Sequence, residues 1–200
     1  MRVSKEQAAQ NRQHILTAAA RLFREHGITA TGVDAITKDA GLTHGGLYSQ
    51  FGSKEAIAAE AIRFAATRSK RVWQQAVERK QGTKALRSLV EGYLSPAHRD
   101  SPGQGCVIAA LGADVARQPQ SVRDAFTKEL EDVFEVLAQL MPGDNPSRRY
   151  EEAIAAFAAM VGALILARAV NDETLSERIL QTAAKRVGDL TNDRKQARRS

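Results

Sequence analysis

Residues 31 to 54 carry polar side chains at a spacing suited to contacts with a charged, grooved surface. Thr43, His44, Tyr48 and Ser49 stand close together there, with glycines between them. Side chains three and four residues apart share one face of a helix, so these groups would lie together on an outer face. Hydroxyl and imidazole groups in such a place can hydrogen-bond phosphate oxygens or base edges. The pattern therefore indicates recognition of duplex nucleic acid.

Two very short helices would position these groups. Thr31 is placed to cap a first helix that ends at Gly41. Thr43 is placed to cap a second helix, in which Leu47 and Phe51 are the only large apolar side chains at core spacing. Two short helices joined by a glycine turn have the layout of a helix-turn-helix DNA reader.

A longer helix is expected before this pair, from about Glu6 to His26, because apolar residues recur there at three and four residues. With it, the segment resembles the N-terminal domain of the TetR family of bacterial transcriptional repressors. The run Gly-Leu-Thr-His-Gly-Gly-Leu-Tyr-Ser-Gln-Phe at 41–51, followed by Gly-Ser-Lys-Glu, carries the resemblance. It extends without a gap from about Arg12 through Lys54.

The resemblance and the positions together suggest which residues contact DNA. Tyr48 and Lys54 match family positions that usually touch the phosphate backbone, and His44 is a candidate reader of base edges. The expected DNA contacts are Thr31, Gly32, Thr43, His44, Gly45, Gly46, Tyr48, Ser49 and Lys54. The plainer interpretation is that polar groups on a small helix are simply solvated, and capping alone would explain Thr43.

The remainder of the chain also reads as helical, so we predict an all-α fold of about nine helices. A long helix would join the helix-turn-helix domain (1–53) to a domain for ligand binding and dimerisation (54–190), as the resemblance implies, and residues 191–200 would form a basic flexible tail. The expected longest loop is 95–105, and Thr174 is expected to cap the last helix.

The charge distribution agrees with a DNA-binding N-terminus. The net charge is +6, and residues 1–54 carry 7 basic and 4 acidic side chains, whereas residues 185–200 carry 6 and 2. A basic N-terminal arm beside a DNA reader is suited to phosphate contact. The basic C-terminal tail is more often just a solvated end.

The apolar run 153–167 indicates a partner. Apolar residues surround most of the helix that this run would form, so one face can pack on the domain while another remains apolar and exposed. In the TetR family the last two helices form a dimer interface, and the expected interface residues are Ile154, Phe157, Ala158, Val161, Gly162, Ile165, Ile179 and Ala183. The alternative is the centre of a monomeric bundle. With 15 residues the run is short of the roughly 20 needed to span a bilayer, so we expect no membrane contact.

The resemblance also implies a site for a small-molecule effector between about residues 54 and 141. Trp73, Tyr93 and Phe126 are candidate lining residues, although aromatic residues at helical spacing are more often ordinary core. Cys106, the single cysteine, is either a small buried hydrophobe or a sensor. Placed in the first turn of a helix, its thiolate would be favoured by free amides and the helix dipole.

These observations predict a cytoplasmic, dimeric repressor that binds duplex DNA at a near-palindromic operator and leaves it when a small molecule or reactive compound binds. We expect no catalytic residues, no cofactor and no metal. A DNA-binding protein without a small-molecule switch is one alternative. A small hydrolase using Cys106 with His98 is a remote one, since no acidic partner or metal-spaced cluster accompanies them.

Overall fold

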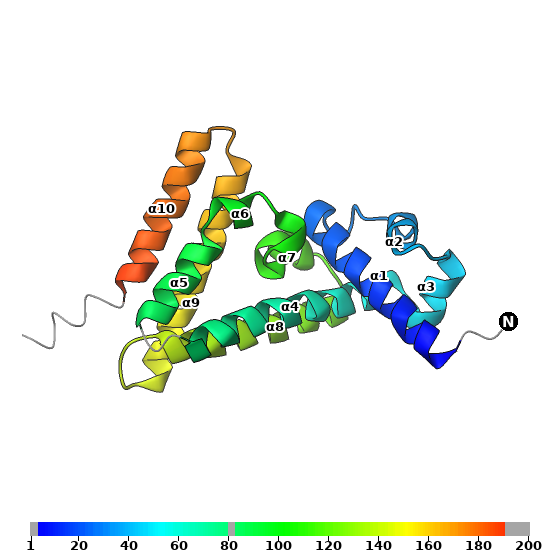
Figure 1. Cartoon of the computed structure of the whole chain (residues 1–200), viewed down its shortest axis with the longest axis horizontal. Coiled ribbons are helices and arrows are strands. Elements are labelled where there is room, and N and C mark those ends of the chain that lie inside the picture. Colours follow the sequence, from blue (N-terminus) through cyan, green and yellow to red (C-terminus); the bar gives the residue numbers. More distant parts are fainter. Residues whose placement is uncertain (1–3, 80–82, 191–200) are drawn as a thin grey trace, which may run out of the picture. The chain divides into compact units, whose positions relative to one another are not determined.

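The computed structural model describes residues 4–79 and 83–190, and every regular element in these ranges is a helix (Figure 1). The elements are α1 (Lys5–His26), α2 (Val33–Ala40), α3 (His44–Phe51), α4 (Lys54–Arg79), α5 (Thr83–Tyr93), α6 (Pro96–Arg99), the 3-10 helix η1 (Pro102–Gln104), α7 (Val107–Val115), α8 (Gln120–Leu140), α9 (Pro146–Ala169) and α10 (Glu173–Asp189). The all-α prediction is confirmed. The predicted N-terminal arm, up to residue 3, and the tail 191–200 lie outside the described residues.

The described residues form ten α-helices where about nine were expected, because the predicted loop 95–105 contains α6 and η1. Ser95 caps α6 by accepting a hydrogen bond from the His98 amide at 3.2 Å, and Pro96 takes the first helical position. A serine followed by proline is a helix start signal. The helix it begins is only one turn long, which is why the segment reads as a loop.

The chain packs as two compact units. Among the described residues, the first unit holds 4–68 and 102–129, and the second holds 69–79, 83–101 and 130–190. Both α4 and α8 contribute residues to each unit. The predicted functional division at residue 53 differs from this packing division and stays a prediction.

In the first unit, α1 is the central element. Its predicted apolar face is buried, with Ile15, Ala19 and Phe23 each no more than 1% exposed. The helices α2 and α3 pack on α1, and so do η1 and α7 from much later in the chain. The helix α1 therefore supports both the helix-turn-helix pair, α2 and α3, and residues 102–115.

In the second unit, α10 packs along both α9 and α5 (Figure 1). The helix α10 begins one residue before the expected cap, because Asp172, and not Thr174, accepts a hydrogen bond from the Leu175 amide at 3.0 Å. Asp is as good an N-cap as Thr and its carboxylate also complements the helix dipole. The prediction that Thr174 caps the last helix was therefore wrong by two positions.

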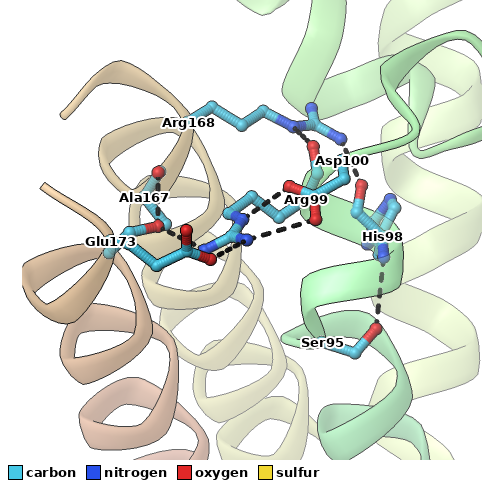
Figure 2. A network of polar contacts seen from close by, with 8 residues as sticks. Ser95, His98, Arg99, Asp100, Ala167, Arg168 and Glu173 are labelled. Atoms are coloured by element: carbon cyan, nitrogen blue, oxygen red, sulfur yellow. Dashed lines mark hydrogen bonds and ion pairs between the residues drawn. The ribbon is translucent and has the colours of Figure 1, made fainter. Parts of the chain in front are cut away.

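A network of polar contacts fixes α6 against the turn between α9 and α10, as Figure 2 shows. Arg168 donates hydrogen bonds to the carbonyl oxygens of His98 and Arg99, at 2.7 and 3.0 Å. Arg99 in turn donates to Asp100, Glu173 and Ser176. Because Arg99 is only 11% exposed, these partners satisfy a charge that is largely removed from water.

Candidate nucleic-acid interface

The helix α3 is built to show its outer face. Thr43 caps it as predicted, accepting a hydrogen bond from the Gly46 amide at 3.4 Å, and its inward residues Leu47 and Phe51 are buried. Thr43, His44, Gly45, Tyr48 and Ser49 are exposed. Two large anchors in an eight-residue helix leave most of its surface to the solvent. Such a surface is available to a groove of duplex DNA.

The turn before α3 depends on Gly41. Its φ of 67° and ψ of 32° lie in the left-handed region, which glycine adopts without the clash a side chain would bring. The Leu42 amide then donates to the Thr37 carbonyl at 2.9 Å. The Gly41 amide also donates to the Lys38 carbonyl at 3.3 Å. These two bonds close the C-terminus of α2 and set the direction of α3.

The polar side chains of α3 are partly engaged with their own helix. The Ser49 hydroxyl donates to the Gly46 carbonyl at 2.9 Å. Tyr48 is 44% exposed, and its ring lies edge-on to that of His44 with centroids 6.3 Å apart. Beyond its chain neighbours and the backbone of its own helix, no atom of the described residues lies within 4 Å of the place where a side chain would begin at Gly45. The exposed face of α3 therefore presents the rings of His44 and Tyr48 beside the backbone of Gly45, which carries no side chain.

The structure corrects the expected role of Thr31. This residue does not cap α2, since the N-cap position is Gly32 and no side chain caps there. Thr31 is 3% exposed, and both its hydroxyl and its amide donate to the Gly27 carbonyl, at 2.7 and 3.2 Å. The hydroxyl found a nearer acceptor in the preceding turn, which is a common alternative to capping. Gly32 is exposed and remains available to an anion.

Lys54 begins α4 and is half-buried. Its ammonium group donates to the Thr29 carbonyl at 3.2 Å, so it holds the turn between α1 and α2. An ammonium group has three donors, which leaves two for another acceptor such as a phosphate. Ser53 caps α4 by accepting from the Ala56 amide at 3.1 Å.

Asp114, a residue that the sequence did not single out, holds the same turn from the other side. Its carboxylate accepts hydrogen bonds from the Ile28 amide at 2.5 Å and from the amide and hydroxyl of Thr29 at 3.3 and 3.2 Å. Gln118 adds a fourth at 3.3 Å. Burial acts to raise the pKa of Asp114, but these hydrogen bonds outweigh it and the pKa lies below its ordinary value. We call this set of contacts the Asp114 clamp.

A second long-range contact attaches η1 to α1. Arg24 donates to the carbonyl oxygen of Gly103, with Nε at 3.0 Å. The approach is close: a side chain at Gly103 would begin 2.2 Å from Oε1 of Glu25 and 2.9 Å from its Cδ. The 3-10 helix η1 therefore lies directly against α1, and a side chain at Gly103 would require the Glu25 side chain to move.

Arg12 was also missed, because an exposed arginine in a helix carries no distinctive pattern. Its guanidinium lies over the Phe51 ring, 4.2 Å from the centroid, donates to the Gln50 carbonyl at 3.1 Å and pairs with Glu60. One side chain of α1 thereby touches the end of α3 and the start of α4. Cation–π contacts of this kind contribute about 0.5–1 kcal/mol at partly exposed sites.

The candidate effector residues fall into both units. In the second unit, Trp73 and Tyr93 meet edge to face with centroids 5.9 Å apart, and Phe157 contacts both rings. In the first unit, the Phe126 ring packs by the backbone of Gly112. Phe134 extends the aromatic cluster by its contact with Phe157.

Cys106 and His98 also lie in different units. Cys106 is the N-cap residue of α7, one position before the expected helix start, and is half-buried. Burial lowers the pKa of His98, so the ring is neutral near pH 7, and Nδ1 lies 2.6 Å from the Tyr93 carbonyl oxygen. No group of three His, Cys, Asp or Glu residues in the described ranges is arranged to hold a metal ion.

The helix α9 has one buried and one open side. Of the expected interface residues, Ile154, Ala158 and Ile165 are exposed, Val161 and Gly162 are half-buried, as are Ile179 and Ala183 of α10, and Phe157 is buried in the aromatic cluster. Leu166 and Leu175 are exposed as well, at 57% and 45%. By length and composition alone α9 could also cross a membrane, a test that a soluble protein's core helix passes too.

Comparisons with known proteins agree with this geometry. A family model described as "Bacterial regulatory proteins, tetR family" matches residues 15–61. An uncharacterized HTH-type transcriptional regulator of Mycobacterium tuberculosis is 28% identical over 171 residues, which cover 82% of this chain and 87% of the relative. The regulator UidR of Escherichia coli K12 is 29% identical over 135 residues, 68% of this chain and 66% of the relative.

Solved structures share the fold. The reduced form of NemR from Escherichia coli superposes with a TM-score of 0.76 at 21% identity, over 88% of this chain and 94% of that one. The regulatory protein TetR of Rhodobacter sphaeroides superposes with a TM-score of 0.74 at 23% identity, over 89% and 97%.

Proposed function

Because the chain belongs to the TetR family of bacterial regulatory proteins and is a DNA-binding transcriptional regulator, we propose that it is a dimeric, cytoplasmic repressor. It binds a near-palindromic operator and is released when a small molecule or a reactive compound binds. The helix-turn-helix domains of the two subunits, about 34 Å apart, would reach successive major-groove faces of such a site.

The outer face of α3 carries this proposal. Thr43, His44, Tyr48 and Ser49 are exposed on a helix whose only buried side chains are Leu47 and Phe51. Base-edge contacts fall to His44, and phosphate contacts to Tyr48, Lys54 and the amide of Gly32. Thr43 and Ser49 are polar groups at the rim of the same face.

We predict that His44→Ala changes which base is preferred, whereas Lys54→Ala weakens binding to all duplexes. Loss of one phosphate contact flattens the slope of log affinity against log salt by about one unit. Fluorescence anisotropy on an operator selected from a random duplex library, over a salt series, measures both. Because Lys54 also holds the Thr29 carbonyl, a melting curve of the variant accompanies the titration. Equal losses on operator and random DNA for His44→Ala would remove it as a reader.

The proposed dimer uses the open side of α9. Ile154, Ala158 and Ile165 recur at four and seven residues, which places them on one stripe opposite the buried residues. Apart from its chain neighbours and the α9 backbone, the part of the chain that the structure describes places no atom within 4 Å of where a side chain would begin at Gly162. An exposed apolar stripe with a gap for close approach is suited to a second copy of the same helix.

The proposed effector site is centred on the aromatic cluster of the second unit. Trp73 is half-buried, while Tyr93 and Phe157 are buried against it. Flat apolar ligands suit such a wall of ring edges and faces. Trp73 is also the single tryptophan of the chain, so its fluorescence reports directly on what binds there.

We further propose that Cys106 responds to electrophiles. It sits at the N-terminus of α7, between the Gly103 contact with α1 and the helix that carries Asp114. We predict that N-ethylmaleimide releases the parent protein from operator DNA, while Cys106→Ser stays bound, as anisotropy would show. A thiol that labels no faster than free cysteine at pH 7, or a serine variant that is still released, would assign Cys106 to the core.

A further inference from the structure

A contact between a carboxylate and an imidazole joins α2 and α3 on their open side. The carboxylate of Asp34, in the first turn of α2, contacts Nε2 of His44, the first residue of α3. Asp34 is 92% exposed and His44 is 51% exposed. The acid therefore stands on the surface where α3 would meet DNA, and a bare carboxylate there repels phosphates. A residue that weakens DNA attraction must contribute something else if it is functional.

We propose that Asp34 is a positioning residue for base recognition, which orients the His44 ring and rejects unspecific duplexes. The proposal rests on the proposed role of His44 as a base reader. It assigns to a carboxylate on α2 a part in the specificity of α3, without any contact between that carboxylate and a base.

The hydrogen-bonding chemistry of the ring supports this role. In a neutral imidazole one nitrogen donates and the other accepts, and a carboxylate beside Nε2 holds the proton on that nitrogen. Nδ1 is then left as an acceptor, which is complementary to the exocyclic amino group of adenine or cytosine in the major groove. The ring is also flanked by Tyr48, whose ring meets it edge-on. Contacts with both Asp34 and Tyr48 restrict the orientations of the His44 ring.

The charge of Asp34 adds a second effect. The negative charge weakens the attraction of the protein to the phosphate backbone of every duplex to the same extent. Operator DNA offsets this loss of affinity through the base contact, whereas random DNA does not. The ratio of operator affinity to random-duplex affinity thus isolates positioning, because the repulsion cancels in it. Orientation through a single hydrogen bond should change this ratio by about three- to tenfold.

Five variants separate the possibilities. Asp34→Ala removes both the acceptor and the charge, and Asp34→Asn removes the charge but keeps an oxygen that accepts from Nε2. Asp39→Ala is the matched control: it removes one carboxylate from the same helix, where Asp39 pairs with Arg21 at 2.6 Å. His44→Ala and its combination with Asp34→Ala complete a double-mutant cycle.

We expect Asp34→Ala to lower the operator-to-random ratio about three- to tenfold and to loosen the preference at one base pair in library selection. Asp34→Asn should keep most of the ratio, and Asp39→Ala all of it. In the His44→Ala background, Asp34→Ala should leave the ratio unchanged. An unchanged ratio for Asp34→Ala alone, or an equal loss with and without His44, would overturn the proposal. If the parent itself fails to discriminate operator from random DNA, the proposed function fails first.

Discussion

Replacing Asp114 with alanine is expected to destabilise the protein by about 3 kcal/mol, through loss of a charged acceptor and exposure of unpaired amides. The Asp114 side chain is 15% exposed and accepts from the amide of the buried Ile28 and from the amide of the exposed Thr29, so its removal leaves the Ile28 donor without its partner. For a chain of this size the melting temperature should fall by about 6–12 °C. Circular dichroism at 222 nm or differential scanning calorimetry measures the change.

The effect should depend on pH in a defined direction. The pKa of Asp114 is lower in the folded than in the unfolded chain, so its stabilisation is complete above the ordinary carboxyl value of about 3.9. It is lost as the pH falls through the folded value. The difference in stability between the parent and Asp114→Ala should thus be full at pH 7 and narrow as the pH falls below about 4. Asp124→Ala removes an exposed carboxylate of the same unit and should leave the stability unchanged both at pH 7 and below about pH 4. An Asp114→Ala protein as stable as the parent at pH 7 would contradict the clamp.

Placing a glutamate at Ile165 is expected to convert the proposed dimer into a monomer. A charge buried without a partner in an interface costs about 3–5 kcal/mol, which raises the dimer dissociation constant by about two to three orders of magnitude. Operator affinity should fall with it, because a single head reads only a half-site. Val161→Glu should act in the same way. Sedimentation at micromolar concentration measures the assembly and anisotropy the binding.

Val72→Glu is the control for this experiment. Val72 is 59% exposed on α4 and Ile165 is 45% exposed on α9, so the same charge enters another exposed aliphatic position, outside the proposed α9 stripe. It should leave assembly unchanged. A parent protein that sediments as a monomer at micromolar concentration, or an Ile165→Glu protein that sediments as a dimer, would refute the assignment of this face.

Local features of the fold could be predicted from the sequence. Thr43 caps α3 as expected, because a cap requires only a short polar side chain and an amide three residues away. Gly41 ends α2 as expected, since its left-handed backbone is a local property. The buried face of α1 follows from periodicity in the same way. These signals act over at most one helical turn or one period of the apolar pattern.

The features that were missed depend on residues far apart in the chain. Asp114 lies 86 residues from Ile28 and its role appears only when α7 packs on α1. Thr31 was misassigned because its hydroxyl has two acceptors in reach, and the choice between them is made by the turn. At the candidate site, exposure of the α3 face was predictable, but the pairing of His44 with Asp34 joins two helices whose approach the sequence does not encode locally.

The Asp114 clamp also bears on how such regulators can be recombined. A chimera that joins residues 1–53 of this chain to the remainder of a relative would carry the Ile28 and Thr29 amides but not the carboxylate that accepts from them. The graft would leave these donors without their native acceptor unless the recipient supplies one at the equivalent place. The segment to transplant is therefore discontinuous: it consists of the N-terminal helices together with residues 102–118, which supply the Asp114 carboxylate and the Gly103 carbonyl that accepts from Arg24.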